Sequence, residues 1–107
     1  MKIVLCYKEF ELGELTYEGE VYTFTPVGGC ELAKQRYPIP RYSPILSGGV
    51  KKDNKLFGEY AYFFKLLVNP YIKSEANIVD GDSEFEKLIK ISRLNLDHGS
   101  FYLKNRK

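Results

Sequence analysis

Two short alternating segments that meet at a tight turn near the start of the chain constrain its fold more than any other feature. Leu15 and Tyr17 repeat at every second position on the first arm, and Tyr22 and Phe24 do so on the second. A period of two is typical of strands that bury one face. Gly19 tolerates positive φ at the turn, so the arms can fold back without strain. The sequence therefore predicts a β-hairpin that serves as scaffold.

The hairpin is expected to belong to a wider antiparallel sheet. The apolar segment 2–7 precedes it, and the connection between the two is too short for a crossover helix. We therefore predict a three-stranded meander, whose last strand ends at Pro26 because proline lacks a ladder donor.

A central helix is predicted over residues 55–68. Asp53 or Asn54 can cap its first turn, and Asn69-Pro70 ends it because proline disfavours helical geometry in the residue before it. Tyr62 lies off the main apolar face. That face, at helical spacing, consists of Leu56, Tyr60, Phe63, Phe64, Leu67 and Val68.

Other signals complete the predicted architecture. A second main helix is expected over 83–94, where Ser83 and Glu86 have the spacing of a capping box. The fold class is α+β: a small antiparallel sheet, formed by the N-terminal meander, packs against two main helices in a single domain, 1–107. The remaining predictions are a short helix over 30–36, an extended connection over 37–44, a mobile tip over 47–54 and an edge strand over 100–103.

The hairpin and the central helix resemble the small N-terminal subdomain of HipA-type toxin kinases. The likeness covers roughly the first two thirds of the chain. Leu67-Val68-Asn69-Pro70 stands where that family has Leu-Pro-Glu-Gly, and the kinase body is absent, so the chain is most similar to HipS, the stand-alone subunit of HipB-HipS-HipT toxin–antitoxin systems. The residues that carry the resemblance are Gly13-Glu14-Leu15, Phe24, Leu56-Phe57, Phe63-Phe64 and Leu66-Leu67.

This resemblance implies a non-enzymatic antitoxin that binds and restrains a HipT-type serine/threonine kinase, with a HipB-type DNA-binding protein as a further partner. Neither Asp-Phe-Gly nor His-Arg-Asp occurs in the sequence, so the phosphotransfer motifs of kinases are missing. Two other classes of function stay open. One is a small nucleic-acid-associated module, and the other is a stand-alone inhibitor of phage type.

Length and composition are those of one ordinary domain. The 107 residues, 44% hydrophobic and 28% charged, allow a modest core but no separate catalytic lobe. Segment 3–7 has strand length and is followed by Lys8, so we expect neither a signal peptide nor a membrane span, and a cytoplasmic location. Cys6 and Cys30 lack metal-ligand spacing and are expected to be buried free thiols.

No catalytic, cofactor-binding or metal-binding residue is predicted. His98, the single histidine, is interpreted as a turn residue because no nucleophile in a recognisable motif accompanies it. Segment 80–84 lacks the later ligands of a calcium loop. Gly28-Gly29 lacks the further glycine and the Lys-Ser/Thr of phosphate-binding motifs. The sequence therefore predicts a protein that is not an enzyme and carries no cofactor.

Charged residues are grouped along the chain. Glutamates between Glu9 and Glu20 give the hairpin an acidic rim, which the inhibitor hypothesis uses as a phosphate mimic, and basic residues gather between Lys34 and Lys55. A net charge of +2 is low for a dedicated nucleic-acid binder. We expect a protein-binding surface of basic and aromatic side chains instead. The predicted partner-binding residues are Tyr37, Arg41, Tyr42, Lys51, Lys52 and Tyr62.

Overall fold

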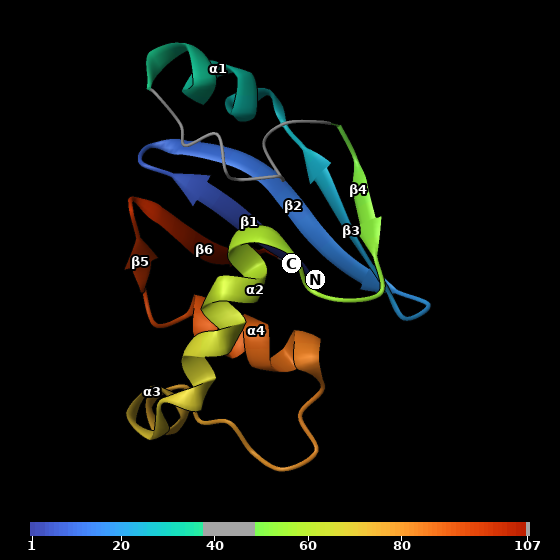
Figure 1. The fold of residues 1–107 in the computed structure, drawn as a ribbon, viewed down its shortest axis with the longest axis vertical. Helices are drawn as coiled ribbons and strands as arrows, with labels where there is room; N and C mark the ends of the chain where they lie inside the picture. The colour runs from blue at the N-terminus through green and yellow to red at the C-terminus, as the bar shows by residue number, and fades with distance from the viewer. Residues whose placement is uncertain (38–48, 107) are drawn as a thin grey trace.

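The computed structural model describes residues 1–37 and 49–106, which form an antiparallel sheet and several helices (Figure 1). The strands are β1 (Lys2–Tyr7), β2 (Phe10–Glu18), β3 (Val21–Pro26), β4 (Lys51–Asp53), β5 (Asp97–His98) and β6 (Phe101–Arg106). The helices are α1 (Gly28–Arg36), α2 (Gly58–Lys65), the 3₁₀ turn η2 (Leu66–Val68), α3 (Pro70–Glu75) and α4 (Glu84–Ser92).

Strand β1 lies inside a six-stranded sheet. The strand order is β4-β3-β2-β1-β6-β5, and every neighbouring pair is antiparallel. The hairpin pairs Leu15 with Phe24 and Tyr17 with Tyr22. The α+β class and the meander β1-β2-β3 are therefore confirmed. Because β6 pairs with β1, the two ends of the described chain lie close together (Figure 1).

The apolar face of the sheet is buried under α2 and α4. Ile3 and Leu5 of β1 and Phe24 of β3 have no exposed surface. Tyr60 of α2 is also fully buried, and its hydroxyl donates a 2.9 Å hydrogen bond to the Ile3 carbonyl. Burying each large apolar side chain contributes about 1.5–3 kcal/mol. The same cluster includes Leu15, Tyr22, Phe63, Leu88, Ile91, Phe101 and Leu103.

Helix α1 packs closely on β2, and a glycine makes this approach possible. A Cβ atom at Gly29 would overlap the carbonyl oxygen of Glu11. Cys30 and Ala33 on the same helix are buried. The short helix predicted over 30–36 is confirmed, and the structure gives its glycine a packing role.

The central helix is shorter than predicted. It begins at Gly58, after Phe57 as N-cap, and neither predicted cap residue is used. The carboxylate of Asp53 instead accepts a 3.1 Å hydrogen bond from the Lys55 amide, which closes a turn ahead of the helix. Val68 is 86% exposed, so its assignment to the buried face is wrong. The last turn is 3₁₀, which changes the angular spacing of its side chains.

Three other segments differ from the predictions. Residues 51–53, predicted as part of a mobile tip, form β4 and pair with β3. The strand predicted at the edge over 100–103 is β6, which lies between β1 and β5. Helix α3 is not predicted from the sequence at all. Asn69 caps it by accepting a 2.9 Å hydrogen bond from the Tyr71 amide, and Pro70 stands in its first turn, where a missing donor is harmless.

The second main helix, α4, is confirmed. The Ser83 hydroxyl accepts a 3.1 Å hydrogen bond from the Glu86 amide, as the capping-box spacing predicts. The helix ends at Ser92, two residues before the predicted end at Leu94.

Gly29→Ala should destabilise the protein by about 1–3 kcal/mol, because the added methyl group forces α1 away from β2. Gly28→Ala is the matched control, since nothing lies within 4 Å of the Cβ position there. This control should change stability by less than about 0.5 kcal/mol. Urea denaturation measures both variants. Equal midpoints would contradict the close contact between α1 and β2.

Phe63→Ala should cost about 3–5 kcal/mol, because the ring fills the space between helix and sheet. Phe63 is 1% exposed, whereas Tyr62 is 38% exposed and Phe64 is partly buried. Alanine variants should therefore lose stability in the order Phe63, Phe64, Tyr62, as read from their denaturant midpoints. A Tyr62→Ala variant less stable than Phe63→Ala would show that the helix is oriented differently.

Candidate functional site

The predicted partner-binding residues that the structure describes do not form one surface. Lys51 and Lys52 lie on β4, at one edge of the sheet. Tyr62 stacks on His98 with the ring centroids 3.8 Å apart, and His98 lies on β5, at the opposite edge. His98, expected in a turn, therefore belongs to a short strand and packs against a helix. The basic and aromatic parts of the predicted surface are separated by the width of the sheet.

Tyr37 at the end of α1 is partly buried and lies at the fringe of the core. Its ring packs edge-on against Tyr7 and Phe10, and its hydroxyl donates a 2.7 Å hydrogen bond to the Glu9 carboxylate. This hydrogen bond lowers the pKa of Glu9. Residues 38–48 lie outside the described residues. That range holds two further predicted site residues, Arg41 and Tyr42, most of the extended connection and the start of the mobile tip.

The glutamates of the predicted acidic rim are partly neutralised by cations. Glu11 binds Arg106 at 2.6 Å and Lys104 at 3.2 Å. Glu14 binds Arg106 at 3.3 Å and Lys2 at 3.4 Å. The β-ladder places these side chains on the sheet face opposite the apolar core, and Glu9 also pairs with Arg36. Glu11 and Glu14 of the predicted acidic rim are thus paired with cations, whereas Glu18 and Glu20 have no ion-pair partner among the described residues.

Cys6 and Cys30 are free and buried, as predicted. Burial raises the pKa of both thiols, so the unreactive protonated form dominates near neutral pH. Among residues 1–37 and 49–106, no three His, Cys, Asp or Glu side chains gather in a way that could hold a metal ion. No helix in this part of the chain is both long enough and apolar enough to cross a bilayer.

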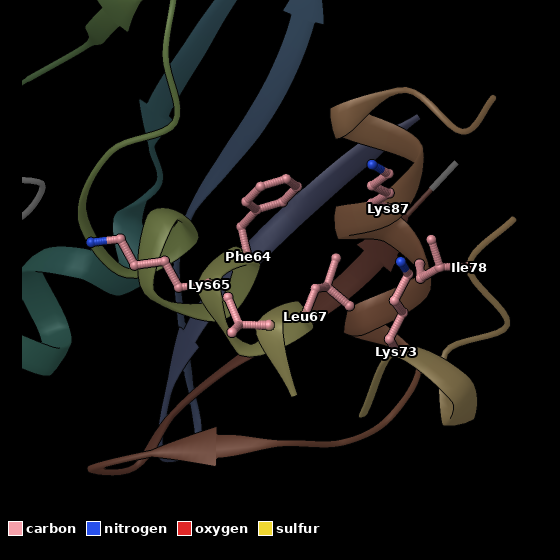
Figure 2. Close-up of a pocket in the computed structure, with 7 residues that line it drawn as sticks. Phe64, Lys65, Leu67, Lys73, Ile78 and Lys87 are labelled. Atoms are coloured by element: carbon pink, nitrogen blue, oxygen red, sulfur yellow. The ribbon is translucent and has the colours of Figure 1, made fainter. Parts of the chain in front are cut away.

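A hollow of about 290 Å³ opens where η2, α3 and α4 meet, and we call it the Leu67 hollow. Figure 2 shows Phe64 and Leu67 with Lys65 on one side, and Lys73, Ile78 and Lys87 on the other. Val68 completes the lining. The floor is apolar, and the polar atoms of the lining side chains are lysine ammonium groups.

A second hollow, of about 400 Å³, shares Phe64 and Lys65 with the first. We call it the Leu56 hollow. Its other lining residues come from the turn before α2, from α2 itself and from the start of α4: Asn54, Lys55, Leu56, Ala61 and Glu84. The two hollows therefore adjoin at Phe64 and Lys65.

The lysines around the two hollows form no ion pair with any residue in 1–37 or 49–106. None of the four ammonium groups, of Lys55, Lys65, Lys73 and Lys87, pairs with a carboxylate in the described part of the chain. The one acidic lining residue, Glu84, accepts a 2.6 Å hydrogen bond from the Tyr22 hydroxyl. Burial and this hydrogen bond raise the pKa of Tyr22, so it stays a donor. The surface combines exposed apolar area with unopposed positive charge.

Sequence reasoning missed most of this surface. Lys65, Lys73 and Lys87 stand eight and fourteen positions apart in the chain, and no linear charge cluster marks them. Lys73 lies on α3, the helix that was not predicted. The only available signal was Val68, an apolar residue beside the Asn69-Pro70 break.

Comparison with protein-family models, with curated proteins and with solved structures finds no significant match to this chain. A functional proposal for this chain therefore starts from the geometry of this surface.

Glu11→Gln should destabilise the protein near pH 7 by about 0.2–1 kcal/mol, the range of exposed ion pairs. Its hydrogen bond with Arg106 lowers the pKa of the Glu11 carboxyl in the folded state. The stabilisation is therefore present above the unfolded-state pKa and is lost as the pH falls through the folded-state value. Glu18→Gln at the hairpin tip is the control. Urea titrations at pH 7 and pH 2 should show the Glu11 effect only at the higher pH, and a pH-independent difference would contradict it.

Proposed function

We propose that this chain is a non-enzymatic protein-binding module. The observation that carries the proposal is the pair of adjoining hollows, with an apolar floor and four unpaired lysines. At about 290 and 400 Å³ the two hollows are close to the low end of the range for small-molecule sites, about 300–1,000 Å³, and an 86% exposed valine, Val68, lines the Leu67 hollow. Exposed apolar area with a polar border is typical of surfaces that bind other proteins.

The two other function classes receive less support. A nucleic-acid module needs a positive surface that follows a phosphate backbone, whereas Lys51 and Lys52 lie on β4 and line neither hollow. The inhibitor hypothesis needs free carboxylates, whereas Glu11 and Glu14 are paired with Arg106 and its neighbours. The protein-binding hypothesis gives a role to the exposed apolar surface of the hollows, for which neither alternative provides an explanation.

The partner that the sequence resemblance favours is a HipT-type serine/threonine kinase. In this proposal the chain acts in the cytoplasm, binds the kinase and restrains it, and a HipB-type DNA-binding protein joins the complex. The chain would supply binding energy only, since its sequence lacks the kinase motifs. Restraint then means that the bound chain either blocks access to the active site of the kinase or binds an inactive form more tightly than the active form.

Co-expression with a HipT-type kinase should give a complex that survives size-exclusion chromatography. The kinase rate should fall in proportion to the fraction of kinase bound, measured by phosphate transfer from labelled ATP. The purified chain alone is the control and should turn over no ATP. Turnover that survives repurification and disappears with a point mutation in this chain would refute the non-enzymatic proposal, and a kinase rate unchanged at saturation would refute restraint.

A further inference from the structure

We propose that the Leu56 and Leu67 hollows together bind an acidic segment of a partner protein, one that carries two apolar anchor side chains. This inference deepens the proposed protein-binding function and rests on it. It adds the surface, the charge of the partner segment and the arrangement of its anchors, none of which follows from the sequence resemblance.

The apolar anchors follow from the two hollows. Both are lined by Phe64 and Lys65, and both are too small for a folded element but large enough for a side chain. A segment that spans both hollows can place one apolar side chain on Leu56 and Ala61 and the next on Leu67 and Ile78. Anchors of this kind, one helical turn apart, are the usual way in which a short helix binds a groove.

The acidic character follows from the lysines. Lys65 stands between the hollows, and Lys55 and Lys87 extend the positive charge to the two ends. The one acidic lining residue, Glu84, already accepts a hydrogen bond from Tyr22. Glu84 keeps its negative charge, but four lysines against one glutamate leave the lining of the two hollows net positive. Carboxylates placed beside the anchors would therefore meet an excess of cations, which favours association and selects against basic partners.

Residues 38–48 of this chain cannot supply these charges, because their sequence contains no Asp or Glu. The hairpin tip of a second copy is an alternative source of negative charge, since Glu18 ends β2 and Glu20 lies in the turn. An anionic membrane surface and a nucleic acid offer negative charge without anchors at a fixed spacing. The apolar floor favours a peptide segment over both.

Fluorescein-labelled synthetic helical peptides provide the probe. One panel carries Glu and Asp around two leucines spaced three or four residues apart, and control panels replace the acids by lysine or the leucines by alanine. Fluorescence polarisation should show binding by the acidic, anchored peptides that weakens as salt rises. The control peptides should bind about ten-fold more weakly or not at all.

Val68→Glu is the most informative variant. The Val68 side chain is 86% exposed, so the substitution removes apolar surface from the hollow and adds a charge that repels an acidic segment, without disturbing the core. It should weaken binding about ten-fold. Lys73→Gln with Lys87→Gln should weaken it on the order of three- to ten-fold. Lys51→Gln with Lys52→Gln is the matched control on β4 and should leave the affinity unchanged.

Four results would overturn the inference. The first is that no acidic anchored peptide binds, and the second is that Val68→Glu and the parent protein bind the peptide with equal affinity. The third is that phosphatidylserine vesicles or duplex DNA bind through the same residues while the peptides do not. The fourth is that the protein self-associates in sedimentation experiments and that Val68→Glu abolishes this self-association. The proposed function is judged separately. If the kinase complex forms equally well with Val68→Glu, the hollows are not the binding site, but the proposed function stands. If the peptides bind but no kinase complex forms, the binding surface stands and the kinase is not the partner.

Discussion

The pairing of β6 with β1 is the constraint on which the rest of the structure depends. It runs in register from Lys2 opposite Arg106 to Tyr7 opposite Phe101, so the first and last described strands are neighbours. The helices that cover the apolar face of the sheet, α2 and α4, come from the part of the chain between these two strands. Helices α2 and α4 meet there, and Tyr60 ties the first of them to β1 through the Ile3 carbonyl. The two hollows are a consequence, since they open where these helices and η2 leave Phe64 incompletely covered.

The parts of the fold that follow from neighbouring residues were predictable from the sequence. Alternation around Gly19 gives the hairpin, and Ser83 with Glu86 gives the start of α4. The parts that depend on distant partners were not. Lys51–Asp53 contains two lysines and looks like a loop, yet it becomes a strand because β3 offers it a free edge. Asn69-Pro70 indicated a helix end, but the same pair also begins α3, and sequence alone shows only the first role.

The candidate site depends even more on contacts between residues that are distant in the sequence. The sequence drew attention to Lys51 and Lys52 because they are adjacent in the chain, and to Tyr62 because it lies off the helix face. The sheet then placed them at opposite edges. The lysines that do share a surface come from the turn before α2 and from helices α2, α3 and α4. Their proximity is a property of helix packing, which a linear charge pattern does not contain.

The position of β6 inside the sheet has a consequence for synthesis of the protein. While the chain leaves the ribosome, β1 and the hairpin can pair at once, but the other edge of β1 stays open until the residues after Ser100 emerge. Val4 and Cys6, fully buried in the finished sheet, lie on that strand. An unpaired strand edge next to apolar side chains is a template for pairing with other chains. A nascent chain stalled before β6 would therefore be the form of this protein most in need of a chaperone.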